Sequence, residues 1–194
     1  MAPDPDAALM LAFQRGDGAA FRALFERHAR AMIAFCHHFV RDPARAEELA
    51  QDVFLKLHQA GDRYRPTARF KTFLYRIASN HCLNELRRGE YGARRAGEHE
   101  AAADPDTLPS HDASPEESAH GKALERRVGA LLAALPEKQR SALVLCRLEG
   151  LSYEEIAEVL ETSVSAVKSL VHRATVAAAD ALAPHAPGSR EALP

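Results

Sequence analysis

The stretch that decides the fold is TARFKTFLYRIASNHCLNELRR, residues 67–88. Its apolar side chains recur every three or four positions, which predicts a helix with one buried face. The apolar positions are Phe70, Phe73, Leu74, Ile77 and Ala78. The cations of this stretch are expected to remain exposed to solvent, and they are Arg69, Lys71, Arg76, Arg87 and Arg88. The segment is therefore expected to be a docked helix with a basic outer surface.

The charge of this region contrasts with that of the whole chain. Residues 61–95 hold nine Lys and Arg against three Asp and Glu, whereas the chain has a formal net charge of −2. The loop before the helix, GDRYRP at 61–66, adds basic and aromatic side chains. Cations interleaved with aromatics and amides suit a phosphate backbone and unstacked bases. A solvated charged helix face is the alternative interpretation.

Length and composition exclude several classes of protein. A chain of 194 residues suffices for one or two small domains. No apolar run approaches the ~18 residues of a membrane span, and the start MAPDPD lacks the features of a signal peptide, so we expect a cytoplasmic protein. Cys36, Cys82 and Cys146 lie in apolar helical patterns without disulfide or zinc spacing, which predicts reduced, buried thiols. A pI of about 6.6 argues against a generally basic nucleic-acid coat protein, so contacts to nucleic acid require local patches.

Helical periodicity extends over most of the chain, which predicts an all-α fold of two small helical domains. We expect the first domain at 5–95 and the second, a helix-turn-helix bundle, at 122–183. Between them, 96–121 reads as an acidic flexible linker, because its central part has seven acids, three prolines and no Lys or Arg. Residues 184–194 read as a disordered tail.

An Asp-Pro pair predicts the start of a helix at Pro43 that runs to about Ala60, with Gly61 ending it. Asp42 can cap the helix, and Pro fits its first turn without losing a hydrogen bond. The predicted buried stripe is Ala46, Leu49, Ala50, Val53 and Leu57. The remaining apolar and acidic side chains suggest a ridge for docking another protein, although ordinary surface is the alternative. This docking ridge consists of Glu48, Gln51, Asp52, Phe54 and Leu55.

Residues 150–174, GLSYEEIAEVLETSVSAVKSLVHRA, have the pattern of a helix-turn-helix. Ser152 and Glu155 form a capping box for the first helix, and Ser163 caps the second. The polar face of the second helix combines small residues, which permit close approach to bases, with cations. Its members are Ser163, Ser165, Lys168, Ser169, His172 and Arg173. A plain helical hairpin is the alternative.

Patterns of catalysis and metal binding are absent from the sequence. His37 and His38 are adjacent, so they cannot share one helix face. The pair at 81–82 has no second pair of ligands at zinc-like spacing. The chain contains no GxSxG, phosphate loop or GxGxxG. We therefore expect no enzymatic activity, no catalytic residues, no metal and no cofactor.

Three stretches occur in a characteristic order: AEELAQDVFLKLHQ at 46–59, FKTFLYRIASNHCLNELRR at 70–88, and the segment at 135–174 that begins LPEKQR. In this order the chain resembles the bacterial extracytoplasmic-function sigma factors, the promoter-specificity subunits of RNA polymerase. The resemblance implies a protein that binds the β′ and β subunits of core RNA polymerase, recognises and melts promoter DNA, and is held inactive by an anti-sigma factor. It implies no membrane insertion. A stand-alone helix-turn-helix regulator remains the alternative.

The resemblance also implies roles for individual residues. The docking ridge looks like the element that binds the coiled-coil clamp of the polymerase's largest subunit. The loop at 63–65 and the helix after it look like the part that opens the minus-ten element, with a flipped base held near Asn80. This minus-ten set is Arg63, Tyr64, Arg65, Arg69, Lys71, Arg76, Asn80, Asn84, Arg87 and Arg88. The polar face of the second helix of the helix-turn-helix looks like the reader of the minus-thirty-five element.

Three positions depart from the pattern of the family. Phe73 stands where Trp is usual, Asn84 where Asp is frequent, and Leu170 where an Arg commonly follows the Lys-Ser pair. Loss of a guanidinium at 170 removes a charged contact, which predicts weaker minus-thirty-five readout. The acidic linker is similar to the family's connector, and we expect its acids to occupy cationic walls of the polymerase's nucleic-acid channel.

Overall fold

The computed structural model describes residues 4–96 and 126–182, and every regular element in these ranges is helical. The first unit comprises α1 (Pro5–Gln14), α2 (Gly18–Val40), α3 (Pro43–Ala60), the 3-10 turn η1 (Gly61–Arg63) and α4 (Phe70–Ala96). The second unit comprises a helix over 126–134, then α6 (Glu137–Arg147), α7 (Tyr153–Val159) and α8 (Val164–Leu182). The all-α prediction is confirmed. The predicted linker from 97 onward and the predicted tail lie outside the described residues.

Aspartates begin the early helices, as their positions in the sequence predict. Asp17 accepts hydrogen bonds from the backbone N–H groups of Ala19 and Ala20 at 3.0 and 3.2 Å. Asp42 accepts from the N–H of Arg45 at 2.8 Å. Each carboxylate satisfies amides that have no partner in the first helical turn.

Helical periodicity also predicts the buried faces. All five residues of the α3 stripe are at most 3% exposed. On α4, Phe70, Leu74 and Ala78 are completely buried, while Phe73 and Ile77 are half-buried. These two helices pack with α2, which runs unbroken for 23 residues. The predicted core of the first unit is therefore confirmed at these positions.

Gly61 ends α3 for a reason of packing rather than backbone conformation. Its φ is −51°, which any residue can adopt. A Cβ at this position would lie 2.6 Å from Cε1 of Phe13. The Gln14 side chain also donates to the carbonyls of Gly61 and Tyr64, at 2.6 and 3.0 Å. The end of α1 and the turn after α3 are thus fitted tightly together.

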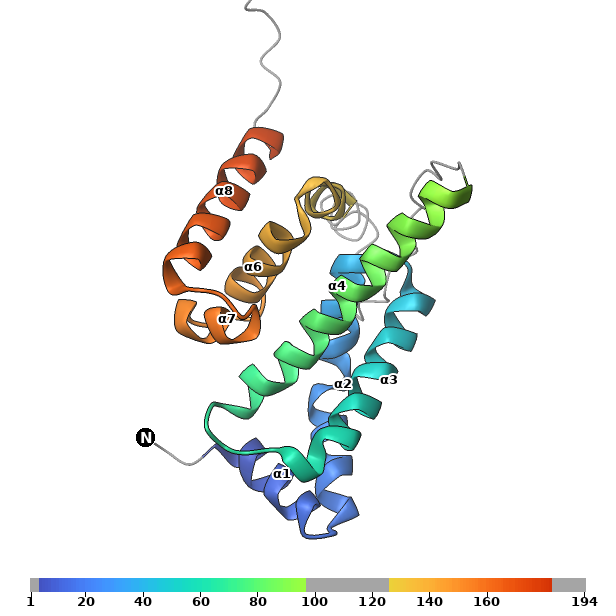
Figure 1. Ribbon diagram of the computed structural model, residues 1–194, viewed down its shortest axis with the longest axis vertical. Helices are drawn as coiled ribbons and strands as arrows, with labels where there is room; N and C mark the ends of the chain where they lie inside the picture. Colours follow the sequence, from blue (N-terminus) through green and yellow to red (C-terminus); the bar gives the residue numbers. More distant parts are fainter. Residues whose placement is uncertain (1–3, 97–125, 183–194) are drawn as a thin grey trace, which may run out of the picture.

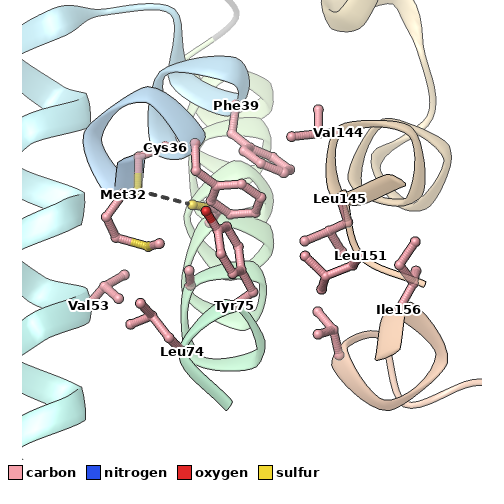
Figure 2. Close-up of a cluster of buried hydrophobic side chains, with 14 of the residues drawn as sticks. Met32, Cys36, Phe39, Val53, Leu74, Tyr75, Val144, Leu145, Leu151 and Ile156 are labelled. Carbon is pink, nitrogen blue, oxygen red and sulfur yellow. Dashed lines mark hydrogen bonds between the residues drawn. The ribbon is translucent and has the colours of Figure 1, made fainter. Parts of the chain in front are cut away.

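Two of the three cysteines meet inside the first unit. Cys36 on α2 and Cys82 on α4 are completely buried, with their Sγ atoms 3.7 Å apart (Figure 2). Both are free thiols, and their hydrogen bond, followed by burial, raises the pKa of Cys82. Cys146 is also free but only half-buried. The prediction of burial therefore holds for two of the three cysteines.

α4 is the helix of the first unit that faces the second unit: α2 and α3 pack on one side of it, and the second unit packs on the other (Figure 1). Across this boundary, Phe39 and Tyr75 face Val144, Leu145 and Leu151 (Figure 2). All five are at most 5% exposed. The buried side chains of the two units thus form one continuous cluster. The helical periodicity of each half predicts its own buried face but does not predict that the two halves pack together.

Candidate nucleic-acid interface

The basic helix α4 is positioned by a carboxylate from the start of the chain. One oxygen of Asp4 accepts from the N–H of Phe70 at 2.7 Å. Its other oxygen accepts from the N–H groups of Asp6 and Ala7 at 3.0 and 3.3 Å. A single side chain therefore caps both α1 and α4. Local sequence patterns do not show the second cap, because the two partners are 66 residues apart.

The outer face of α4 presents amides and cations at one-turn spacing. Arg76, Asn80, Asn84 and Arg88 follow one another at intervals of four, and Arg87 lies beside the last of them. Intervals of three and four place side chains on one helix face. All five residues are exposed, as predicted. We call this set the α4 row; its geometry suits contacts along a nucleic-acid strand.

A cavity of about 150 Å³ opens beside the first residue of the α4 row. It has cationic, hydroxyl and aromatic walls, with one carboxylate from the second unit. The lining residues are Arg63, Arg65, Thr67, Ala68, Thr72, Phe73, Arg76 and Glu158. The guanidinium of Arg76 lies 5.5 Å from the centroid of the Phe73 ring, at cation–π distance. A planar base with an adjacent phosphate fits these chemical groups.

Thr72 is another residue that lines this cavity. Its Oγ1 is buried and makes no hydrogen bond to the described parts of the chain.

Only three of the ten members of the predicted minus-ten set line the cavity, namely Arg63, Arg65 and Arg76, and Tyr64 and Asn80 are among those that do not. Tyr64 is only 1% exposed, since its ring packs against those of Phe70 and Phe73. Burial, with smaller effects of Asp4 and Asp6, raises its pKa to about 12. Tyr64 therefore supports the loop, and the expectation of an aromatic side chain open to bases is wrong at this position. Asn80 lies one turn beyond Arg76 and does not line the cavity.

Three other members of the minus-ten set contact the second unit. Nζ of Lys71 donates to the carbonyl oxygen of Glu149 at 2.5 Å. Arg69 lies 3.6 Å from Glu155, and Arg87 lies 3.5 Å from a carboxylate oxygen on α6. These cations are therefore already matched with acids in this arrangement of the two units.

The docking ridge on α3 is only partly as predicted. Glu48, Gln51, Asp52 and Leu55 are exposed, Leu55 by 56%. Phe54 is 4% exposed, which corrects the expectation that it belongs to an outward ridge.

Phe54 is buried because its ring packs against that of Phe25 on α2, with the centroids 4.8 Å apart. Phe25 itself is 42% exposed, so it supplies the aromatic surface beside the ridge. The packing of α2 on α3 leaves the Phe25 ring open to solvent beside the ridge.

The helix-turn-helix forms as the sequence predicts. The N–H of Ser152 donates to Glu155 at 2.8 Å, and the N–H of Glu155 donates to Oγ of Ser152 at 3.2 Å, which completes the capping box. Oγ of Ser163 accepts from the N–H of Ala166 at 3.2 Å. All six predicted groove-facing residues of this second helix are exposed. Leu170 is half-buried against the core.

The described parts of the chain contain no group of three or more His, Cys, Asp or Glu that could hold a metal ion. His38 is half-buried, and its partial burial, with a smaller effect of His37, lowers its pKa to about 4. No helix among these residues is long and apolar enough to span a bilayer. The chemistry that the described surface offers is binding through cations, amides and carboxylates.

Two family models match the chain. The Sigma-70 region 2 model matches residues 24–90, and the Sigma-70 region 4 model matches residues 125–176. The RNA polymerase sigma-H factor of Pseudomonas aeruginosa is 34% identical over 186 residues, which cover 93% of this chain and 95% of that protein. The ECF RNA polymerase sigma-E factor of Escherichia coli K12 is 32% identical over 174 residues, covering 87% and 90%.

Solved structures share the fold. CnrH, solved in complex with the cytosolic domain of CnrY, matches with a TM-score of 0.68 and 26% identity, over 91% of this chain and 96% of that one. The sigma factor RpoE of Bartonella quintana, solved with the anti-sigma factor NepR, matches with a TM-score of 0.70 and 22% identity, over 84% and 96%. The two helical units thus occur together in known structures.

Proposed function

Because the chain belongs to the extracytoplasmic-function family of RNA polymerase sigma factors, we propose that the α4 row and its cavity open the minus-ten promoter element. The protein is an alternative sigma factor that binds core RNA polymerase and promoter DNA. Its family is one of initiation factors without enzymatic activity. Family membership therefore decides against the stand-alone regulator that the sequence alone left open.

The cavity beside Arg76 is the observation that carries this proposal. A melted promoter presents unstacked bases, and a pocket that holds one of them prevents the duplex from closing again. Phe73 and the arginines provide stacking and phosphate contacts. The α4 row then holds the following backbone. Strand opening is driven by this binding energy, together with the contacts of the polymerase.

We place the flipped base in the cavity rather than directly at Asn80. Asn80 is one turn farther along the exposed row, where its amide can contact a neighbouring base or sugar. Tyr64 acts indirectly, because its buried ring supports the Phe73 wall of the cavity.

The exposed α3 surface is the proposed site for core polymerase. Leu55, with Phe25 from α2, gives an apolar centre, and Glu48, Gln51 and Asp52 give a polar rim. An apolar centre with a polar rim is the usual anatomy of a protein interface. Phe54 contributes indirectly, because its ring packs against the Phe25 ring and holds it in position.

We propose that α8 and the serine before it read the minus-thirty-five element through the six exposed residues predicted from the sequence. Arg173 donates from Nε to the carbonyl of Ser169 at 3.2 Å, so its guanidinium must turn outward to contact DNA. Leu170 is half-buried and offers no charge. Readout by this helix is therefore expected to depend on Lys168 and on small serines rather than on a row of arginines.

An anti-sigma factor is a further proposed partner, acting with this protein in the cytoplasm. The neighbours CnrH and RpoE were solved with CnrY and with the anti-sigma factor NepR, respectively. In this structure the two units pack together, and the apolar side chains where they meet, which we call the apolar seam, are buried. If the units separate, that seam offers a surface that a partner can cover.

Alanines at Arg76, Asn80 and Arg87 test the minus-ten proposal. In transcription with purified core polymerase, we expect the triple variant to lose about tenfold or more of initiation from a duplex promoter, because roughly 1–3 kcal/mol is lost per base contact. A template with unpaired minus-ten bases should restore part of the activity. Bubble formation is followed by permanganate reactivity of unpaired thymines.

Arg22→Ala is the matched control, since Arg22 is an exposed cation on α2, away from the α4 row. It should leave permanganate reactivity unchanged. Unchanged bubble formation by the triple variant, with normal binding to core polymerase, would contradict the proposed role of α4.

A further inference from the structure

The proposed minus-ten cavity has two walls within the first unit. One wall belongs to the segment 61–69, which we call the pocket loop, and its lining residues are Arg63, Arg65, Thr67 and Ala68. The other wall comes from the first two turns of α4 and consists of Thr72, Phe73 and Arg76. The width of the cavity therefore depends on how the pocket loop is held against the start of α4.

The first helix of the chain is bound to both ends of the pocket loop, beside which it lies (Figure 1). At the start of the loop, the side-chain amide of Gln14 donates to the carbonyl oxygens of Gly61 and Tyr64, at 2.6 and 3.0 Å. At its end, Oδ2 of Asp4 accepts from the N–H of Phe70 at 2.7 Å. Gln14 is the last residue of α1 and Asp4 is its N-cap, so the two contacts lie at opposite ends of one helix.

α1 gives these two contacts a fixed separation. The helix has ten residues, and at a rise of about 1.5 Å per residue it is roughly 15 Å long. A helix keeps its length because backbone hydrogen bonds join each turn to the next, whereas a loop can change its length by rotation about single bonds. α1 therefore fixes the distance between the two ends of the pocket loop.

Gln14 also acts on a cavity residue through a shared acceptor. The carbonyl oxygen of Tyr64 accepts from Nη1 of Arg65 at 3.1 Å as well as from Gln14. A carbonyl oxygen has two lone pairs, so it can accept both hydrogen bonds at once. The ring of Tyr64 packs against Phe73 of the opposite wall, with the centroids 5.0 Å apart. The residue that Gln14 holds is thus in contact with both walls of the cavity.

We propose that Gln14 and Asp4 are positioning residues for minus-ten recognition, which set the separation of the two cavity walls without contacting DNA themselves. This inference rests on the proposed function of the cavity. A pocket discriminates between bases only when its groups are held in place before the base enters. Loss of either contact therefore lowers the selectivity of the pocket. Binding to core polymerase is unaffected, because the exposed α3 surface proposed for it includes neither residue.

Gln14→Met and Gln139→Met form the first matched pair of variants. Both replace a half-buried glutamine by an unbranched apolar side chain of similar length, and neither changes the net charge. Gln14→Met removes the donor to the two carbonyls at the start of the pocket loop. Gln139 lies on α6 of the second unit and does not line the cavity.

Asp4→Asn and Asp17→Asn form the second matched pair. Asp4 uses both of its oxygens, because Oδ1 accepts from the N–H groups of Asp6 and Ala7 while Oδ2 accepts from Phe70. Asparagine has a single side-chain oxygen, so it can cap α1 or α4 but not both. Asp17 accepts both of its hydrogen bonds at one oxygen, and asparagine is an equally good N-cap there.

The measurement is base preference rather than stability. Core polymerase that carries each full-length variant is mixed with a pool of single-stranded DNA that contains a stretch of randomised positions. Bound and unbound DNA are separated and sequenced, and the base frequencies at each position are compared. The amount of each variant that co-purifies with core polymerase is measured in the same samples.

Wild-type holoenzyme should favour one base strongly at the position that the cavity holds. Gln14→Met and Asp4→Asn should each lower this preference by roughly fivefold, which is the effect of about one net hydrogen bond on an equilibrium. The variants Gln139→Met and Asp17→Asn should keep the wild-type preference. A purely structural role for Gln14 and Asp4 would lower the amount of folded protein bound to polymerase, but it would not change the base preference of the molecules that bind.

Two results would overturn this inference: an unchanged base preference in Gln14→Met and Asp4→Asn, or an equal loss of preference in their control variants. Failure of the proposed function is detected separately. If wild-type holoenzyme shows no base preference, or if the triple alanine variant of the α4 row keeps it in full, the cavity and the row are not the minus-ten site, and both proposals fail.

Discussion

His38 near the end of α2 has a pKa far from its ordinary value. Burial, assisted by His37, lowers this pKa from 6.5 to about 4, so the folded protein keeps the ring neutral. Between pH 6.5 and 4 the unfolded chain binds a proton that the folded chain does not. The free energy of unfolding is therefore highest with respect to this group above pH 6.5, and it decreases as the pH falls through this window.

We expect His38→Gln to reduce the dependence of stability on pH. In urea unfolding between pH 7.5 and 4, the wild type should lose about 1–3 kcal/mol more than the variant, since one pKa unit corresponds to about 1.4 kcal/mol. If the free energy of unfolding of the two proteins changed equally with pH, His38 would not be the source of this pH dependence.

Gly61 and Gly18 provide a second comparison between single residues. Gly61→Ala should destabilise the protein by about 1–3 kcal/mol, because the new Cβ would lie 2.6 Å from Phe13. Phe13 cannot easily move aside, since its ring packs against Phe21 and His58, with both centroid distances 4.8 Å. Thermal unfolding of the purified variants measures the effect.

Gly18→Ala serves as the control, because nothing lies within 4 Å of a Cβ at the start of α2. We expect it to be neutral or slightly stabilising, as alanine reduces the freedom of the unfolded chain. Equal melting temperatures for the two variants would show that the contact with Phe13 is not limiting.

The helices of the first unit are joined through their caps as well as through their apolar faces. Asp4 caps α1 and α4, whereas Asp17 caps α2 alone. Asp4→Ala should therefore cost about 2 kcal/mol of unfolding free energy, and Asp17→Ala about 1 kcal/mol. Hydrogen exchange at the N–H of Phe70 should accelerate only in the Asp4 variant. A Phe70 amide that stays protected without Asp4 would argue against the long-range cap.

Helix positions were predictable because their signals are local. Asp-Pro at 42–43, the capping box at 152–155 and the apolar period of α3 each involve residues within one or two turns. The burial of Tyr64 and Phe54 was not predictable in this way, because it depends on rings from neighbouring segments. A helical period predicts which positions share a face, but the edge of the buried face is set by what packs against it.

Arg140 connects the two units of the whole molecule. It is 7% exposed and donates to the carbonyls of Ala133 and Leu135 within its own unit, at 2.9 and 3.3 Å. It also donates to the carbonyl of Phe39 at 3.3 Å, at the end of α2 in the first unit. A cation is favourable at the C-terminal end of a helix.

Arg140→Met should cost about 2–4 kcal/mol of unfolding free energy, because it leaves buried carbonyls without their donor. Lys138→Met, an exposed position on the same helix, should have an effect within about 0.5 kcal/mol. Urea unfolding followed by circular dichroism compares the two. A similar small effect in both variants would mean that Arg140 is dispensable for joining the units.

Local sequence by itself determined the helices, their caps, the helix-turn-helix and the exposed cations of α4. Tertiary structure decided which of those cations face only solvent and which lie beside carboxylates of the second unit. It also decided that Tyr64 is a support, that Phe25 rather than Phe54 is open, and that Asp4 caps α4. The physical reason is distance along the chain: Tyr75 and Glu149 are 74 residues apart, and only the packing of whole helices brings such groups together.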